Sequence, residues 1–174
     1  HLADTFSYPH SLGEGKLYGA QENRQNYYLG LVYEELGNEV SAKECFEKAS
    51  HGIAEPASAM YYNDQPPETI FYQVMALERL GNHEEAKRRF ETLVSYADAH
   101  CHDEVTIDYF AVSLPDLLVF EEDLNIKNRL HCMFMKALGL YGLRNKEESK
   151  TLFENILLEN CNAFQPVIHY QMLF

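Results

Sequence analysis

The sequence predicts an all-α fold, a solenoid of antiparallel helix hairpins, because one short phrase occurs three times along the chain. Each copy holds a leucine, a turn residue and an asparagine, followed at fixed distances by a small residue and by Phe-Glu. Apolar residues at helical spacing stand before and after every copy. Each copy therefore predicts one helix, a tight turn and a second helix, and such units stack on their neighbours. The three copies begin at Leu36, Leu80 and Leu143.

The spacing inside each copy supports this interpretation. The small residue comes five positions after the turn residue, and the phenylalanine comes four positions later. Both side chains therefore share one face of the second helix, where the small one lets two helices approach and the ring fills the seam. Truncating such a buried ring costs about 3–5 kcal/mol. The turn, small and aromatic residues are Gly37, Ala42 and Phe46, then Gly81, Ala86 and Phe90, then Arg144, Ser149 and Phe153.

The first helix of each copy adds a more specific pattern. Leu29-Gly30 followed by Tyr33 in the first copy resembles the tetratricopeptide repeat, whose first helix carries Leu-Gly and then Tyr. The resemblance implies about three stacked repeats. Gln73 and Lys136 depart from it, because they stand where the repeat expects leucine. The other apolar positions are Ile70, Val74 and Leu77 in the second copy and Met133, Ala137 and Leu140 in the third.

The order of segments predicts an interrupted array. The turn residues lie 44 and then 63 positions apart, whereas a regular tetratricopeptide array has a period of about 34 residues. We expect an extended lead-in at 1–21, a single solenoid domain at 22–174, and a helical insert before the third repeat. Asp123 is the expected cap of the long helix that ends at Gly142, and Gln165-Pro166 opens a C-terminal capping helix. The predicted repeats span about 23–56, 67–100 and 130–163, and the insert spans about 101–124.

Two further segments carry a narrower resemblance. The runs Leu12–Lys16 and Asp108–Leu124, continued by Arg129–Cys132, resemble the C-terminal region of large bacterial proteins that place tetratricopeptide repeats after a β-rich domain of unknown function. This resemblance implies no catalytic residue. It implies a fragment of a longer protein, as does a chain that starts at His1 without methionine. Arg144 departs from the turn glycine, and a non-glycine residue in a left-handed turn costs about 1 kcal/mol.

Composition and charge limit the classes of partner that the chain is expected to bind. The 174 residues are 46% apolar, enough for one core or a short solenoid. A formal net charge of -13 argues against nucleic acid or an anionic membrane surface as the ligand. The chain contains no apolar run of membrane-spanning length and no leading secretion signal. We therefore expect a cytoplasmic protein that binds neither nucleic acid nor membrane.

The four cysteines form no CxxC pair, which predicts free thiols in a reducing compartment. Cys45 and Cys161 are expected on the second helices of their repeats, packed as small apolar side chains. A metal site built from His100–His102 with His131-Cys132 is the alternative. Residues two apart on a helix point to opposite sides, and structural zinc favours ligand pairs separated by two to four residues. We therefore expect no metal and no other cofactor.

The inner face of a tetratricopeptide stack is formed by the first helices of its repeats. The resemblance places mostly aromatic and apolar residues there, whereas repeats that clamp a peptide carboxylate use lysine, arginine and asparagine. Tyrosine and arginine are frequent in binding hot spots. The alternative is that inserted helices, a neighbouring domain or a second copy already bury this face. The predicted groove residues are Arg24, Tyr27, Tyr28, Leu31, Phe71, Tyr72, Met75, His131, Phe134 and Met135.

No catalytic pattern appears in the sequence. The tandem acids, such as Glu34-Glu35, Glu84-Glu85 and Glu147-Glu148, diverge by about 100 degrees on a helix and should be solvated. No phosphate loop, nucleophile elbow or HExxH spacing is present. We predict a non-catalytic scaffold for a protein or peptide partner, including an upstream domain of the same chain. The rival hypothesis is an accessory domain of a carbohydrate-active or other enzyme, and self-association is a third.

Overall fold

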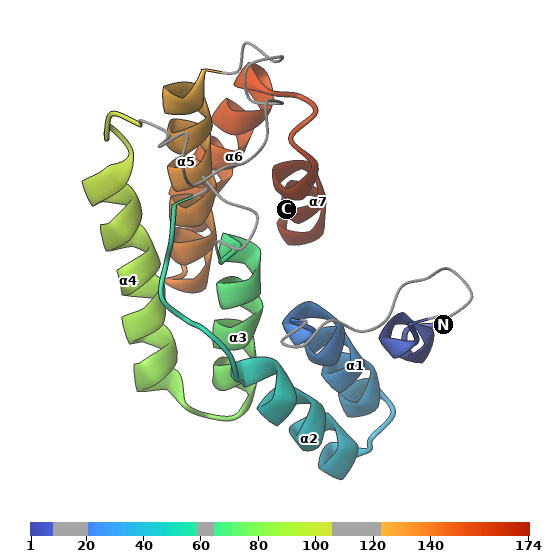
Figure 1. The fold of residues 1–174 in the computed structure, drawn as a ribbon. Helices are drawn as coiled ribbons and strands as arrows, with labels where there is room; N and C mark the ends of the chain where they lie inside the picture. The colour runs from blue at the N-terminus through green and yellow to red at the C-terminus, as the bar shows by residue number, and fades with distance from the viewer. Residues whose placement is uncertain (9–20, 59–64, 106–122) are drawn as a thin grey trace. The chain divides into compact units, whose positions relative to one another are not determined.

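A computed structural model describes residues 1–8, 21–58, 65–105 and 123–174 of the chain (Figure 1). Within these ranges every regular element is helical, and none is a strand. The elements are the short 3-10 helix η1 (Ala3–Phe6) and the α-helices α1 (Asn23–Glu35), α2 (Glu39–Ser50), α3 (Pro67–Arg79), α4 (His83–His100), α5 (Leu124–Gly142), α6 (Lys146–Glu159) and α7 (Phe164–Leu173).

Three hairpin turns, between α1 and α2, α3 and α4, and α5 and α6, share one backbone geometry. In each, the turn residue has a positive φ, namely 72° at Gly37, 81° at Gly81 and 69° at Arg144. The following asparagine N–H bonds a carbonyl five residues earlier, over 2.8 Å from Asn38 and 2.9 Å from Asn145. This pairing satisfies the carbonyls left open at a helix end. The three copies predicted from the sequence are therefore three helix hairpins, and the predicted all-α, tetratricopeptide-like fold class is confirmed.

The chain divides into two compact units. Unit 1 comprises His1–Ala54 with Thr69–Arg89, and unit 2 comprises Glu55–Glu68 with Phe90–Phe174. Unit 1 thus holds the α1/α2 hairpin and most of α3, and unit 2 holds the α5/α6 hairpin and α7. The prediction of one domain over 22–174 stays a prediction.

The α1/α2 hairpin is held together by a close approach of its helices. Gly30 lies against the ring of Phe46, so near that a Cβ at position 30 would stand 2.5 Å from the ring. Ala42 and Phe46 are buried, both 3% exposed, on the face of α2 that the spacing predicted. Small residues on both helices therefore create the space that the phenylalanine fills.

The α5/α6 hairpin of unit 2 follows the same plan with a polar addition. Phe153 and Ser149 are fully buried on α6, and the Ser149 hydroxyl donates to the Ala137 carbonyl of α5 over 2.7 Å. Asp123 caps α5, as predicted, because its carboxylate accepts from the Asn125 N–H at 2.9 Å.

Helix α7 lies against α6, where the capping helix was predicted (Figure 1). His169 is fully buried, and its ring meets Phe134 edge-on with the centroids 5.5 Å apart. The Tyr170 hydroxyl donates to Glu154 of α6 over 3.0 Å. Packing, a ring contact and a hydrogen bond thus join this helix to the third hairpin.

Several predictions need correction or lie outside the described residues. The lead-in is not extended throughout, because Ala3–Phe6 forms a 3-10 turn with its own backbone hydrogen bonds. Cys161 lies beyond the end of α6 and is exposed, whereas it was predicted to pack on that helix. The insert predicted at 101–124 and the narrower resemblance at 12–16 and 108–124 fall mostly or wholly on residues that the structure does not describe.

Candidate functional site

An aromatic cluster occupies the inside of unit 1. Tyr27 and Tyr28 of α1 meet Phe71 and Tyr72 of α3 and Phe46 of α2, with neighbouring ring centroids 5.4–5.9 Å apart. Tilted and edge-on rings at this separation add to the energy of burial. The cluster therefore fixes α1, α2 and α3 to one another.

Three of these predicted groove residues are part of the core. Tyr27, Phe71 and Tyr72 are 5%, 2% and 1% exposed. Burial also raises the pKa of the Tyr27 phenol, against the opposing effect of Arg79, so the phenol stays neutral at physiological pH. These three side chains belong to the packing among α1, α2 and α3.

Above the cluster, part of the predicted groove remains accessible. The Arg24 guanidinium stands 5.9 Å from the Tyr72 ring centroid, and the Tyr28 and Tyr72 hydroxyls lie 3.1 Å apart. Leu31 and Met75 follow one helical turn later on α1 and α3. These side chains are half-buried, and we call them the rim: Arg24, Tyr28, Leu31 and Met75.

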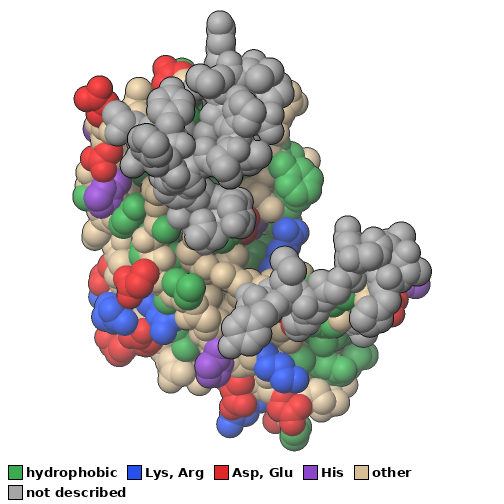
Figure 2. All heavy atoms as spheres, in the orientation of Figure 1, with side chains coloured by type: hydrophobic (Ala, Val, Ile, Leu, Met, Phe, Trp, Pro, Cys, Tyr) green, Lys and Arg blue, Asp and Glu red, His purple; other side chains and the backbone are tan. Residues whose placement is uncertain are grey.

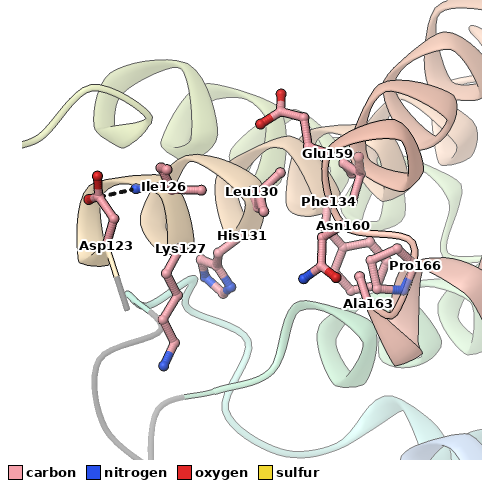
Figure 3. Close-up of a pocket in the computed structure, with 11 residues that line it drawn as sticks. Asp123, Ile126, Lys127, Leu130, His131, Phe134, Glu159, Asn160, Ala163 and Pro166 are labelled. Carbon is pink, nitrogen blue, oxygen red and sulfur yellow. Dashed lines mark hydrogen bonds between the residues drawn. The ribbon is translucent and has the colours of Figure 1, made fainter. Parts of the chain in front are cut away.

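Unit 2 places its predicted groove residues differently. His131 and Phe134 line a pocket of about 450 Å³, with α5 on one side and the turn between α6 and α7 on the other (Figure 3). Phe134 is 5% exposed, whereas His131 is half-buried. Met135 is fully buried in the core. Ile126, Leu130, Ile156, Ala163 and Pro166 give the pocket an apolar lining, and Asp123, Lys127, Glu159 and Asn160 are its polar residues.

One edge of this pocket is fixed by an ion pair. Arg129 of α5 donates to Glu159 of α6 through both terminal nitrogens, one of them at 2.8 Å. The hydrogen bond with Arg129 lowers the pKa of Glu159, and the same bond raises the pKa of Arg129. Both groups are therefore charged at any physiological pH.

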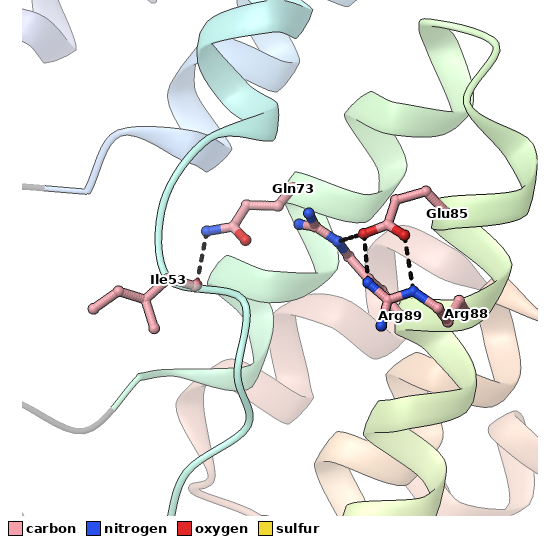
Figure 4. A network of polar contacts seen from close by, with 5 residues as sticks. All are labelled: Ile53, Gln73, Glu85, Arg88 and Arg89. Carbon is pink, nitrogen blue, oxygen red and sulfur yellow. Dashed lines mark hydrogen bonds and ion pairs between the residues drawn. The ribbon is translucent and has the colours of Figure 1, made fainter.

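A non-helical segment follows α2, and its backbone is held by side chains from the first helices of the hairpins. We call residues 51–58 the strap. Asn23 of α1 donates to the carbonyls of Ala49 and His51 over 2.7 and 2.6 Å. Gln73 of α3 donates to the carbonyl of Ile53 over 3.1 Å (Figure 4). These contacts lie within unit 1 and were not predicted from the sequence.

Two of the departures from the repeat pattern have local explanations. Gln73, in place of leucine, is the residue that holds the strap. Lys136, at the same position of α5, pairs with Asp98 of α4 over 2.7 Å, and that hydrogen bond raises its pKa. For Gln73 and Lys136 alike, the sequence signal was a polar residue at a normally apolar position. This signal did not indicate which residue each side chain would contact.

Two of the histidines considered for a metal site, His100 and His131, have polar partners within the protein. His100 Nδ1 lies 2.6 Å from a carboxylate oxygen of Asp103, and His131 Nε2 donates to the Ala57 carbonyl over 2.9 Å within unit 2. Burial raises the pKa of the Cys132 thiol to about 11, which disfavours the thiolate that metals bind. Across the described ranges, no group of three or more His, Cys, Asp or Glu is arranged to hold a metal ion.

The acidic pairs were predicted to be solvated, and this holds for only some of their members, because Glu34 is in an ion pair with Arg79 and Glu85 is half-buried. Glu84 is exposed, and Glu85 is bound by Arg88 and Arg89, whose hydrogen bonds lower its pKa to about 2 (Figure 4). A carboxylate held ionised in this way is a poor general acid. Figure 2 shows basic side chains in mixed groups with acidic ones on the face that it draws. None of the described helices has the length and apolar character needed to cross a bilayer.

Comparison with known families finds two matches along the chain. One tetratricopeptide repeat model matches residues 26–50, which cover most of α1 and α2. A second tetratricopeptide repeat model matches residues 68–98, which cover most of α3 and α4. Both hairpins are similar to tetratricopeptide repeats. No solved structure matches the chain. The matches support a tetratricopeptide repeat domain, and such repeats generally mediate protein–protein interactions.

Proposed function

We propose that this chain is a non-catalytic protein-interaction module whose rim in unit 1 binds a segment of a partner polypeptide. The observation that carries the proposal is the rim itself. Arg24 and Tyr28 keep accessible surface directly over a buried aromatic cluster that holds them in place. Arginine and tyrosine backed by a packed core are typical of binding hot spots, since little conformational entropy is lost when they engage a partner.

The tetratricopeptide matches support the class of partner, because such repeats usually bind proteins or peptides. The net charge of -13 favours a partner with basic residues over nucleic acid or an anionic membrane. His131 and Phe134 belong to the proposal as a second contact area, the pocket of unit 2. The partner is a separate protein, an upstream domain of a longer bacterial protein that contains this chain, or a second copy.

A cytoplasmic location is part of the same proposal. All four cysteines are free thiols, two of them buried in the core at Cys45 and Cys132. Buried free thiols suit a compartment in which glutathione keeps cysteines reduced.

The test is selection of peptides from a random library displayed on phage, with the immobilised chain as bait. We expect an enriched sequence with basic or aromatic residues. Its Kd should rise at least about tenfold in the double variant Arg24→Ala with Tyr28→Ala, because both predicted anchors are removed. Val40→Ala is the matched control, since Val40 is an apolar residue of unit 1, 72% exposed, outside the rim.

Two results would contradict the proposal. The first is that no peptide sequence is enriched above a bait-free selection. The second is that the double variant binds the enriched peptide as well as the wild type does. Circular dichroism of each variant shows whether a loss of binding comes from a loss of helix.

A further inference from the structure

The strap is bound through its main chain, in the way that an extended peptide is bound. The Asn23 amide donates to the carbonyls of Ala49, in the last turn of α2, and of His51, and the Gln73 amide donates to the carbonyl of Ile53, so that alternate carbonyls are bound. Bonds of this kind depend on backbone position and not on the strap's side chains. Asn23 and Gln73 are themselves buried, 6% and 0% exposed, so their amides are held in fixed positions.

The side chain at the Gln73 contact contributes little to this attachment, because Ile53 is 63% exposed. The His51 ring lies 2.5 Å from the Glu47 carbonyl of α2, which is again a polar contact. The attachment in unit 1 therefore depends mainly on hydrogen bonds, and each of these has a modest net value in water because bonds to solvent replace it on release. A partner with comparable backbone bonds and additional side-chain contacts is able to replace the strap.

At Gly52 the strap's backbone lies close to the side-chain amides of Asn23 and Gln73. Its φ is +124°, a conformation that residues with a side chain rarely adopt, and an added Cβ would stand 2.9 Å from Gln73 Nε2. The same Cβ would lie 3.9 Å from Asn23 Nδ2. Glycine at this position is thus required both by the local conformation and by the approach of the strap to its two donors.

The Gln73 amide is only half used by the strap. Its Nε2 donates to Ile53, but among the described residues its buried Oε1 has no hydrogen-bond partner. A peptide in extended conformation presents a carbonyl and an N–H, and both atoms of the amide can pair with it. The unsatisfied oxygen favours replacement of the strap by a better-matched segment, because a buried acceptor without a partner is costly.

We propose that the strap is an autoinhibitory element that occupies, in unit 1, the place of an extended segment of the partner. Asn23 and Gln73 donate hydrogen bonds to main-chain carbonyls, first to those of the strap and then to those of the partner segment that displaces it. Asn23 is on α1, as Arg24 and Tyr28 are, and Gln73 is on α3, as Met75 is, so the same two helices carry the rim and the donors to the strap. The inference rests on the proposed function and adds the conformation of the bound segment and a control on access to it.

The experiment uses the full chain and a fluorescein-labelled peptide with the strap's own sequence, residues 51–58. Gly52→Ala should release the strap, because an added Cβ is strained at a φ of +124° and would lie 2.9 Å from Gln73 Nε2, while Asn23 and Gln73 themselves stay in the sequence. We expect it to bind the peptide at least about fivefold more tightly than the wild type does, the factor expected for loss of one competing hydrogen bond. Gly81→Ala is the matched control, because Gly81 also has a positive φ, +81°, in unit 1, but no atom lies within 4 Å of an added Cβ.

A second variant separates an inhibitory strap from a merely structural loop. Gln73→Leu restores the residue that the repeat pattern expects and removes the donor to Ile53. It should speed proteolytic cleavage of the strap, as Gly52→Ala does, but it should not gain affinity for the peptide. A loop with no inhibitory role would be cleaved faster in both variants and would leave peptide binding unchanged.

The proposal is overturned if Gly52→Ala, Gly81→Ala and the wild type bind the strap peptide equally, or if none binds it. It is also overturned if Gln73→Leu gains as much affinity as Gly52→Ala. This outcome is separate from that of the library selection. Library peptides that bind the wild type and Gly52→Ala equally would refute the strap and leave the proposed function standing. If Gly52→Ala binds the strap peptide but the library gives no enriched peptide, the release of the strap is supported and the proposed function is refuted.

Discussion

The α1/α2 and α5/α6 hairpins have the same turn geometry but differ in the residues at two of its key positions. The turn holds Gly37 in the first and Arg144 in the second, at φ values of 72° and 69°. The small position holds Ala42 in the first and Ser149, with a buried hydroxyl bonded to Ala137, in the second. Of the turn, small and aromatic positions, only the aromatic one holds the same residue, phenylalanine, in both.

These differences indicate which position of the repeated phrase the hairpin fold needs most. The turn geometry persists without glycine, and the small position accepts a hydroxyl once that hydroxyl has an acceptor. The aromatic ring has no substitute in either hairpin. The hairpin therefore depends most on the ring, less on the hydrogen-bonded small residue, and least on the identity of the turn residue.

The largest expected effect is that of removing the ring. Phe46→Ala and Phe153→Ala should each lower the free energy of unfolding by about 3–5 kcal/mol, because both rings are buried and each would leave a cavity. Urea denaturation followed by circular dichroism measures the loss. A loss below 1 kcal/mol in either variant would show that its hairpin does not depend on the aromatic seam.

An intermediate effect is expected from exchanging the turn residues. Arg144→Gly should raise the free energy of unfolding by about 0.5–1 kcal/mol, because relief of left-handed strain exceeds the added entropy of glycine in the unfolded chain. Gly37→Arg should lower it by a similar amount. The same denaturation assay checks both. Destabilisation by Arg144→Gly would mean that the arginine side chain stabilises the third hairpin by more than its backbone strain costs.

The smallest effect concerns the ion pair that joins α5 to α6. The pKa of Glu159 is lowered in the folded chain by its hydrogen bonds to Arg129, so the stabilisation exists above the unfolded pKa of about 4.5 and disappears as pH falls through the lowered value. Glu159→Gln should therefore be less stable than the wild type at pH 7, and the difference should vanish in acid. Thermal melts at pH 7 and below pH 4 test this. An unchanged difference in acid would contradict an electrostatic origin.

The sequence predicted the three hairpins because their signals are local. A turn residue, a small residue and a phenylalanine at fixed spacing suffice to define two helices, and Asp123 and Gln165-Pro166 marked further helix starts in the same way. The left-handed turn at Arg144 was predicted by its place in the phrase, although arginine itself gives no such signal.

The candidate site was less predictable. The family pattern predicts that Tyr27, Tyr28 and Tyr72 share the inner side of the first helices, but it does not predict which of them packs in the core. Burial of Tyr27 and Tyr72, with Tyr28 left accessible, is set by contacts among three helices. The strap was not predicted, because bonds from Asn23 and Gln73 to carbonyls depend on where the backbone runs and leave no periodic trace in the sequence.

The most direct test of the proposed interaction function is the ratio of two dissociation constants for one library-selected peptide, measured by titration calorimetry. We predict that the Arg24→Ala, Tyr28→Ala double variant binds at least about tenfold more weakly than the wild type while both retain the same helical content. Equal dissociation constants for a correctly folded double variant would contradict it, because the rim would then contribute nothing to recognition.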